Sequence, residues 1–258
     1  MTYQFTPPGQ DYSDYANGRV FYGAPGQATF PVRLMSEIFL RCLAIRQKQG
    51  LTEPVTLYDP CCGSAYHLAV CAWLHWPHIR AIIGSDIDTD AISFAARNLG
   101  LLTAVGLNQR ITEIETLHTA YGKASHADAL QSATRLQQQL AHHLAHHAIK
   151  TNLFQANALQ PAALQAGLAG QLIDMVVADV PYGRRASWQG TTTDTADPLW
   201  QLFDSLLTVL PAHALVAIAA DKSQMCKHDG YVRLGRFQIG KRRVFLLQPG
   251  HGKIQAGN

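Results

Sequence analysis

VTLYDPCCGSAYHLAV, residues 55–70, combines a strand, a tight loop and the start of a helix. The apolar residues at 55–58 predict a short buried strand, which Asp59-Pro60 ends because proline cannot donate a hydrogen bond to a sheet ladder. The small residues at 61–65 predict a tight loop, and the apolar run from Leu68 predicts a helix. A strand–loop–helix unit of this kind turns backbone N–H groups toward a ligand, so the stretch is typical of α/β nucleotide sites.

A second strand and an acidic residue follow at the spacing of one strand–helix–strand unit. RAIIGS at 80–85 predicts a buried strand that ends at Asp86, and Asp88 or Thr89 can cap the next helix. An acidic side chain at this strand end is placed to accept hydrogen bonds from both ribose hydroxyls of a nucleoside ligand. The alternative is a loop or helix-cap carboxylate. The agreement of loop, spacing and acid favours the ribose role.

The rest of the chain continues the α/β alternation and closes with a hairpin. Apolar runs predict strands at 148–154, 172–178 and 214–220, helices at 161–167 and 198–210, and a hairpin of 231–239 with 242–247 around Gly240-Lys241. This order predicts an α/β, doubly wound, Rossmann-like fold with a seven-stranded, mostly parallel sheet. We expect a single domain over 1–258, with an N-terminal arm and helix at 1–50 and a helical insertion at 108–148.

The arm and the insertion each allow two interpretations. Residues 1–30 are rich in aromatics, glycine and proline without a clean period, which favours a strap packed on the core over a surface that stacks RNA bases. An amphipathic helix is predicted over 31–49. The insertion contains i, i+4 pairs among His142, His143, His146 and His147, a spacing that can hold zinc. No acid or cysteine stands nearby in sequence, so we expect a solvated helix face and no metal site.

Composition and charge leave an RNA partner open. The 258 residues are 47% hydrophobic with a net charge of +3. Neither a membrane helix nor a secretory signal is visible, so a cytoplasmic location is expected. Five cysteines, two of them adjacent, predict no disulfide framework. Cations cluster in the C-terminal third, and Arg184, Arg185 and Lys222 fall at strand ends beside the predicted site, so we expect them to contact RNA phosphates.

Three loops together carry a family resemblance. DPCCGS at 59–64, SDID at 85–88 and DVPYG at 179–183 resemble class I S-adenosylmethionine-dependent methyltransferases that modify RNA bases. LYDPCCGSAYHL, IIGSDIDTDAISFAARNLGLL and ADVPYG, with LPAHALVAIAADKS and GRFQIGKRRVFLL, resemble more closely the AviRa-type ribosomal RNA guanine methyltransferases, which confer avilamycin resistance. The likeness runs from about residue 30 to the end of the hairpin. It implies S-adenosyl-L-methionine as cofactor, and ribosomal RNA or a ribosomal subunit as partner, with no obligate protein partner.

The resemblance implies a role for each matching residue. Asp59 and the loop through Gly63 would hold the methionine moiety of the cofactor, Asp86 its ribose, and Asp179 would receive the target base. The remaining implied positions are Cys61 and Ser64 in the loop, Ile87 on the adenine, Asn157 and Ala158 at the adenine edge, and Pro181 and Tyr182 beside the target base.

Three positions depart from the family pattern. Ala65 replaces the last glycine of the usual CGSG loop, which requires a backbone conformation that alanine must tolerate. Val180 replaces the first proline of the common DPPY form. Asn157 replaces an aspartate, but its amide oxygen can still accept from the adenine amino group. None of these changes removes a required group.

The chemistry of the third loop favours methyl transfer to an exocyclic amine of guanine. The lone pair of such an amine is delocalised into the ring, and two acceptors for its N–H bonds favour a pyramidal, nucleophilic nitrogen. Asp179 and the carbonyl of Val180 are the expected acceptors, and Tyr182 offers a stacking face. Aspartate rather than asparagine at 179 favours guanine, as in the guanine N2 enzymes that the chain resembles, and the family resemblance implies large-subunit rRNA as the substrate.

Other acceptors and other classes of protein remain open. Transfer RNA guanine, adenine N6 and a protein amide keep the cofactor and change the acceptor. A non-catalytic RNA-binding relative keeps the fold alone, but the intact acidic residues argue against it. A nicotinamide dehydrogenase lacks support because the first loop has no GxGxxG.

Overall fold

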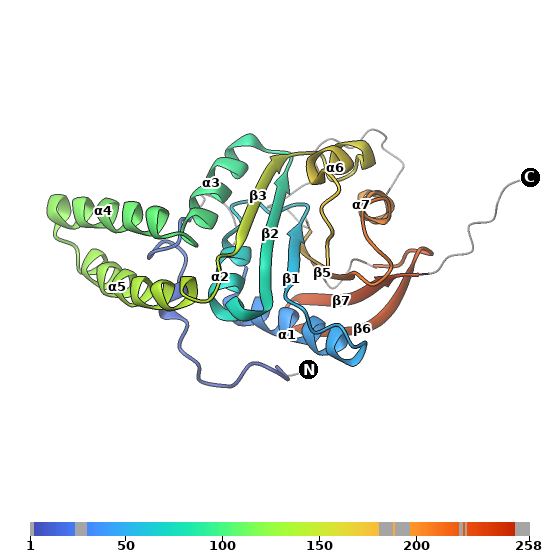
Figure 1. The fold of residues 1–258 in the computed structure, drawn as a ribbon, viewed down its shortest axis with the longest axis horizontal. Coiled ribbons are helices and arrows are strands. Elements are labelled where there is room, and N and C mark those ends of the chain that lie inside the picture. Colours follow the sequence, from blue (N-terminus) through green and yellow to red (C-terminus); the bar gives the residue numbers. More distant parts are fainter. Residues whose placement is uncertain are drawn as a thin grey trace, which may run out of the picture.

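The computed structural model describes residues 3–23, 30–180, 188, 197–221, 224 and 226–250. Among them, seven strands form one sheet in the order β3-β2-β1-β4-β5-β7-β6 (Figure 1). The strands are β1 (Val55–Asp59), β2 (Ile79–Asp86), β3 (Lys150–Gln155), β4 (Met175–Asp179), β5 (Leu215–Asp221), β6 (Tyr231–Ile239) and β7 (Arg242–Pro249).

The first five strands run parallel, and β7 pairs antiparallel with both β5 and β6. The strand order reverses between β1 and β4, where Leu57 pairs with Met175. The carboxyl ends of β1, β2 and β4 therefore meet at one edge of the sheet, beside the switch point where open α/β sheets bind their ligands. The predicted doubly wound fold with its C-terminal hairpin is confirmed.

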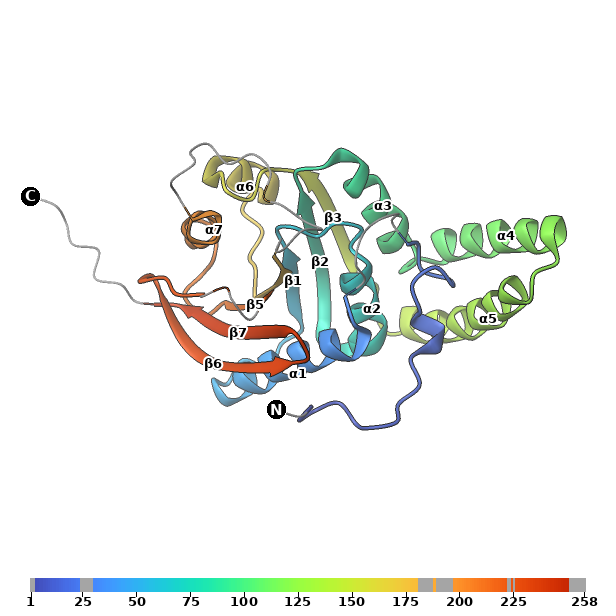
Figure 2. The same ribbon diagram turned by 180° about the vertical axis from the view of Figure 1, so that it is seen from behind.

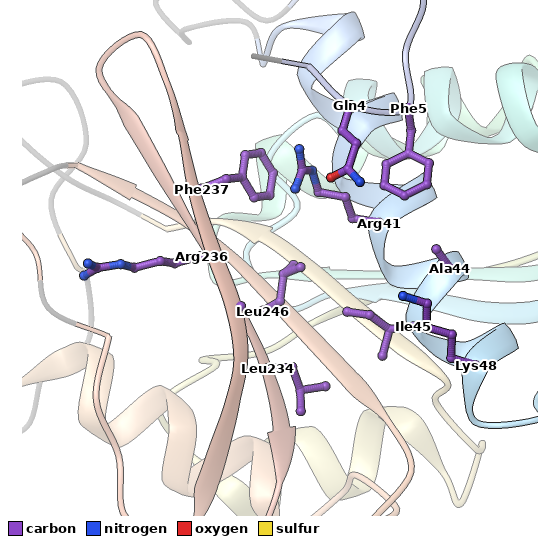
Figure 3. A pocket seen from close by; sticks show the side chains of 11 residues that line it. Gln4, Phe5, Arg41, Ala44, Ile45, Lys48, Leu234, Arg236, Phe237 and Leu246 are labelled. Carbon is purple, nitrogen blue, oxygen red and sulfur yellow. The ribbon is translucent and has the colours of Figure 1, made fainter. Parts of the chain in front are cut away.

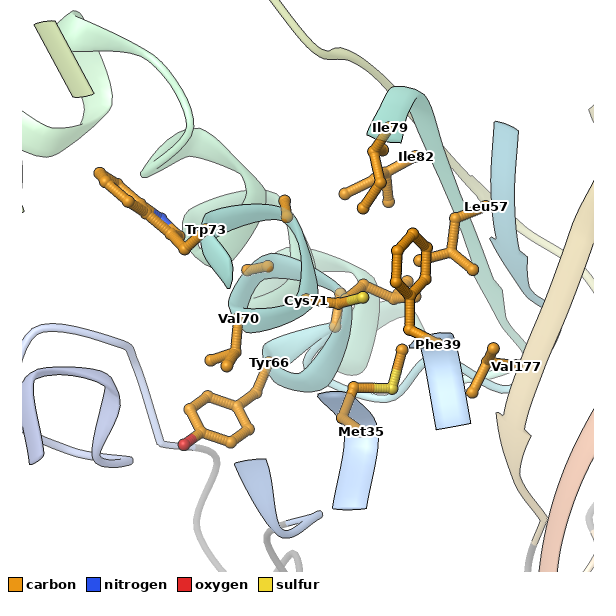
Figure 4. Close-up of a cluster of buried hydrophobic side chains, with 14 of the residues drawn as sticks. Met35, Phe39, Leu57, Tyr66, Val70, Cys71, Trp73, Ile79, Ile82 and Val177 are labelled. Carbon is orange, nitrogen blue, oxygen red and sulfur yellow. The ribbon is translucent and has the colours of Figure 1, made fainter. Parts of the chain in front are cut away.

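Helices cover both faces of the sheet (Figures 1 and 2). One face packs against α1, α2 and α3, and the other against α6 and α7, in two separate apolar clusters. Figure 4 shows the first cluster, where Phe39 of α1 and Cys71 of α2 lie close to Leu57 of β1 and Val177 of β4. The bounds of these helices are α1 (Val32–Lys48), α2 (Tyr66–His75), α3 (Thr89–Gly100), α6 (Pro161–Leu168) and α7 (Pro198–Leu207).

The helical insertion consists of α4 (Ala104–Tyr121) and α5 (Ala124–Leu144), which project together from the side of α3 (Figure 1). The insertion starts four residues before the predicted position 108, because the Thr103 hydroxyl caps α4 by accepting from Gly106 N at 3.1 Å. Gly122, with φ 60°, forms the turn between the two helices.

The N-terminal arm lies on the core as a strap, as favoured from the sequence. It contains a short 3₁₀ turn (Ser13–Tyr15), and Phe21 is fully buried. A second 3₁₀ turn (Trp76–His78) joins α2 to β2.

Three predicted elements extend beyond the strands and helix of the structure. The fourth strand begins at Met175 rather than at 172, because Leu172 is 67% exposed and pairing with β1 starts only at Met175. The third strand begins at Lys150 instead of 148, and α7 ends at Leu207 instead of 210. Within the described ranges, no helix combines the length and the apolar character needed to cross a membrane.

Candidate active site

The loop after β1 is shaped by the buried carboxylate of Asp59. Its Oδ1 accepts from the backbone N–H of Cys61 at 2.8 Å, and its Oδ2 lies 2.7 Å from Nε2 of His67 on α2. Asp59 has no exposed surface. A buried carboxylate is costly unless it is paired and hydrogen-bonded, and these two contacts satisfy it while joining strand, loop and helix.

Two left-handed residues close the same loop. Gly63 has φ 53°, and Ala65, the cap of α2, has φ 50° and ψ 20°. Glycine adopts this region freely, whereas alanine pays about 1–2 kcal/mol. The strained backbone expected at Ala65 is therefore present. Its methyl group is fully buried in the cluster beneath the loop.

The loop packs directly on β2 through Gly84. Cys62 N donates to Ser85 O at 2.9 Å. A Cβ on Gly84 would lie 2.8 Å from the Leu153 side chain and 3.0 Å from Cys62 Sγ, so any other residue here would force these side chains to shift. Burial, together with nearby Asp59 and Asp86, raises the pKa of both Cys61 and Cys62 well above its ordinary value. Both side chains are thus neutral thiols that fill the loop.

Asp86, at the end of β2, connects the second strand to this loop. Its Oδ2 accepts from Gly63 N at 2.8 Å and its Oδ1 from Asp88 N at 3.1 Å. Burial raises the pKa of the carboxyl above its usual range, against the effect of these two hydrogen bonds. The side chain is only partly buried, so its remaining lone pairs can accept from hydroxyl groups.

The residues expected at the adenine edge lie beside Asp86. Ala156 N donates to Asp86 O at 2.9 Å, which places Asn157 and the buried Ala158 just beyond the end of β3. Asn157 Oδ1 accepts from Leu159 N at 3.0 Å. Ile87 is half-buried, and its carbonyl accepts from Gln155 Nε2 at 3.0 Å. The residues at and just after the ends of β2 and β3 are therefore hydrogen-bonded to each other and lie on one side of the candidate site.

Asp179, at the end of β4, faces a cation from the C-terminal hairpin. Its two carboxylate oxygens lie 3.4 Å from Nε and 3.3 Å from Nη2 of Arg242. These distances exceed the 2.7–2.9 Å of a tight charge-assisted bond, so the pair is loose. Burial raises the pKa of Asp179, and the Arg242 guanidinium partly offsets the rise.

An aromatic side chain links the two carboxylate pairs. The Phe30 ring lies 5.7 Å from the His67 ring and 5.2 Å from the Arg242 guanidinium carbon. The β1 and β4 strand ends therefore belong to one site. The site therefore contains three carboxylates, of Asp59, Asp86 and Asp179. His67 pairs with Asp59 and Arg242 with Asp179, while Asp86 accepts from backbone N–H groups.

Three residues of this arrangement were not predicted from the sequence. His67 stands in the first turn of α2, Arg242 was only one of many C-terminal cations, and Asn98 gave no signal. Asn98 is fully buried on α3 and donates to Ser64 O at 2.9 Å, so it supports the loop from behind. Five residues predicted to contact substrate, namely Pro181, Tyr182, Arg184, Arg185 and Lys222, lie outside the described residues.

The histidines of the insertion are divided between solvent and core. His142 and His146 are exposed, as predicted. His143, in contrast, stacks on Trp76 with ring centroids 4.7 Å apart, and His147 Nε2 contacts Ile79 O at 3.0 Å, because this side of α5 packs toward the sheet. In the described part of the chain, no group of three or more His, Cys, Asp or Glu side chains could hold a metal ion.

Comparison with known proteins identifies close relatives. Residues 1–242 match the family model described as "RRNA methyltransferase AviRa". A curated protein of Streptomyces viridochromogenes, 23S rRNA (guanine(2535)-N(1))-methyltransferase, is 41% identical over 238 residues, which are 92% of each chain. Two crystal structures of rRNA methyltransferase AviRa from the same organism superpose with TM-scores of 0.81 and 0.80, at 38% and 40% identity, and cover 93% of each chain.

Proposed function

Because the chain belongs to the AviRa family of rRNA methyltransferases, we propose that it methylates a guanine of 23S ribosomal RNA. S-adenosylmethionine is the methyl donor, and its positively charged sulfur supplies an electrophilic methyl group. The observation that carries the proposal is the meeting of Asp59, Asp86 and Asp179 at neighbouring strand ends around a loop of small residues.

The residues at the ends of β1 and β2 suit this cofactor. Asp86 retains free lone pairs for two ribose hydroxyls, and the left-handed Gly63 lets the loop backbone approach a ligand closely. Both oxygens of Asp59 are already bonded within the protein. Its role toward the methionine moiety is therefore to fix the loop. Ile87, Asn157 and Ala158 would line the adenine, with Cys61 and Ser64 in the loop wall.

Asp179 and Arg242 suit the Watson–Crick edge of guanine. A carboxylate can accept from N1–H and from the neighbouring amino group, and the raised pKa of Asp179 makes it a stronger base for the N1 proton. A guanidinium beside it can stabilise the negative charge that develops on O6 as that proton leaves. We therefore place the methyl group on ring nitrogen N1, the atom named for the Streptomyces relative. The exocyclic amine favoured from the sequence would act as a hydrogen-bond donor.

The remaining proposed contacts with RNA come from residues that follow β4 and β5. Tyr182 would stack on the target base with Pro181 beside it, and Arg184, Arg185 and Lys222 would contact phosphates, as expected from the sequence. The base must leave its stack to reach Asp179, because the carboxylate is largely buried, with 21% of its side chain exposed.

A labelled-methyl transfer assay tests the function. The enzyme is offered 23S rRNA, intact large subunits, transfer RNA and total protein in parallel, and labelled RNA is digested to nucleosides and separated by mass. We expect 1-methylguanosine from 23S rRNA or from the subunit. Label in 2-methylguanosine would show that the exocyclic amine, and not N1, is the methyl acceptor. Label only in transfer RNA, adenine or protein, or in nothing, would contradict the proposed substrate.

A further inference from the structure

The C-terminal hairpin is the most cationic element of the chain. Residues 231–249 contain five cations, Arg233, Arg236, Lys241, Arg242 and Arg243, and no acidic residue, whereas the whole chain carries a net charge of only +3. Arg242 faces Asp179. The other four cations have no ion-pair partner among the residues that the structure describes.

Three of these arginines share one face of the hairpin. Arg236 pairs with Phe245 and Arg233 with Leu247, and directly opposed residues point to the same side of a sheet. Phe245 and Leu247 belong to the cluster on the α7 side. Arg243, two residues from Phe245, lies on that side as well. Figure 3 shows Arg236 directed away from Phe237 and Leu246, which point to the other side. Arg233 and Arg236 are exposed and Arg243 is partly exposed.

The opposite face of the hairpin is occupied by the protein itself. A pocket there is lined by Gln4 and Phe5 of the arm, Arg41 and Ile45 of α1, and Phe237 and Leu246 of the hairpin. Arg41 lies 4.2 Å from the Phe237 ring centroid and 2.7 Å from Glu37, so its charge is already paired. The hairpin arginines that have no ion-pair partner among the described residues therefore lie on the α7 side.

The arginine face leads to the candidate active site. β7 runs antiparallel to β5, and Arg242 is opposite Asp221, the last residue of β5. The hairpin turn thus lies at the edge of the sheet that carries the carboxylates. From Arg233 through Arg236 to Arg243 the row approaches this edge on the α7 side, and the adjoining Arg242, which points to the opposite face, contacts Asp179. An RNA strand held along the row would be directed to the place where its base is needed.

We infer that Arg233, Arg236 and Arg243 form a binding track for RNA backbone phosphates. The inference rests on the proposed function and extends it, because it adds a surface on the edge strand to the contacts expected from the loops. A polyanion is the partner that a row of cations on a hairpin with no acidic residue fits best. The other explanation is protection of the edge: charged side chains on an exposed edge strand prevent pairing with another chain. The salt dependence of RNA affinity distinguishes phosphate binding from edge protection.

The test compares two charge-matched variants. Arg233→Gln with Arg236→Gln removes two exposed cations from the track, and Lys48→Gln with Lys150→Gln removes two exposed cations at the end of α1 and the start of β3. Affinity for a 23S rRNA fragment is measured by fluorescence anisotropy between 50 and 200 mM salt. Each lost phosphate contact reduces the slope of log K against log salt by about 0.7 for single strands and 0.9 for duplex. We expect a slope about 1.4–1.8 lower for the arginine pair and an unchanged slope for the lysine pair.

The outcomes distinguish this inference from the proposed function. Equal slopes for the wild type and the arginine pair, in an enzyme that still methylates rRNA, overturn the track alone. Self-association of the arginine pair without a slope change assigns these residues to edge protection and also overturns it. A reduced slope without any methyl transfer by the wild type supports the track and contradicts the proposed function. Arg236→Glu is the second variant: repulsion should lower the affinity further, and unaltered affinity overturns the track.

Discussion

The loose pair of Asp179 and Arg242 joins the residues that we propose as base and electrostatic partner, and it connects the end of β4 to the start of β7. At 3.3–3.4 Å the guanidinium holds the carboxylate without saturating it. Asp179 can therefore accept a further donor, such as N1–H of guanine, without breaking a strong bond first. This arrangement leads to a kinetic prediction.

Arg242→Gln should slow methyl transfer about 10²-fold, the usual loss for one donor to a developing oxyanion. Because Arg242 lowers the pKa of Asp179, its removal should raise that pKa further. The acidic limb of the profile of kcat/KM against pH should then move to higher pH. Arg242→Lys keeps the charge and should keep the limb near its wild-type position. If the acidic limb of Arg242→Gln stays at its wild-type pH, Arg242 does not influence the pKa of the catalytic base proposed at Asp179.

Asp86→Ala should weaken S-adenosylmethionine binding at least about tenfold, because hydrogen bonds to a charged group contribute about 1.5–3 kcal/mol each. Calorimetry measures the affinity directly, and exposed Asp90→Ala on the next helix is the control. Since the pKa of Asp86 is raised, affinity should also start to fall at a higher pH than an ordinary aspartate would produce. Unchanged affinity would remove the ribose assignment.

Substitutions at Ala65 measure how much backbone strain is present in the loop after β1. Replacement by glycine relieves about 1–2 kcal/mol of left-handed strain, and the greater freedom of glycine in the unfolded chain offsets about 0.4–1 kcal/mol of it. Ala65→Gly should therefore stay within about 1 kcal/mol of the wild type in urea unfolding. Ala65→Val adds a branched side chain at φ 50° in a fully buried site, and should cost about 2 kcal/mol or more. Equal stability of the two variants would refute the strain.

At the scale of elements, Glu37 of α1 fastens the N-terminal arm to the core. Its carboxylate is fully buried and accepts from the backbone N–H groups of Gln4, Phe5 and Thr6 at 2.7–3.0 Å. Arg41 donates to the same carboxylate at 2.7 Å. Burial alone would raise the pKa of Glu37, but these hydrogen bonds outweigh it and lower the pKa. The arm therefore depends on an ionised glutamate.

The lowered pKa of Glu37 makes the arm sensitive to acid. A group whose pKa is lower in the folded state stabilises the fold above its unfolded pKa, about 4.3 for glutamate, and loses this contribution as pH falls through the folded value. Glu37→Gln should reduce the free energy of unfolding at neutral pH and flatten its decline below about pH 4.3. Urea unfolding across pH 3–7 measures both effects. Exposed Glu115→Gln is the control, and a wild-type-like pH dependence in Glu37→Gln would contradict the role.

For the molecule as a whole, local sequence pattern predicted most of the fold. The apolar runs of β1, β2, β4 and β5 are fully or largely buried strands, and Gly240-Lys241 is the hairpin turn. The carboxylates were predictable because each belongs to the last residue of such a strand. The partner of Asp179 was not, since Arg242 is 63 residues away, and neither was the contact of Asn98 with the backbone of Tyr22, 76 residues away. Contacts between residues that distant depend on strand order and helix placement, which no local period encodes.

Asn98 of α3 connects the N-terminal arm to the loop after β1, so replacing it should weaken binding at the proposed cofactor site. Its Oδ1 accepts from Tyr22 N of the arm, and its Nδ2 donates to Tyr22 O and to Ser64 O of the loop. Asn98→Ala leaves these buried groups without a partner, which should cost about 2 kcal/mol or more of unfolding free energy. Hydrogen exchange should increase over residues 12–22, and S-adenosylmethionine affinity should fall. Asn108→Ala, which removes one exposed bond to Gln137, should alter neither. Weakened stability with full cofactor affinity in folded Asn98→Ala would show that the arm and the loop are independent.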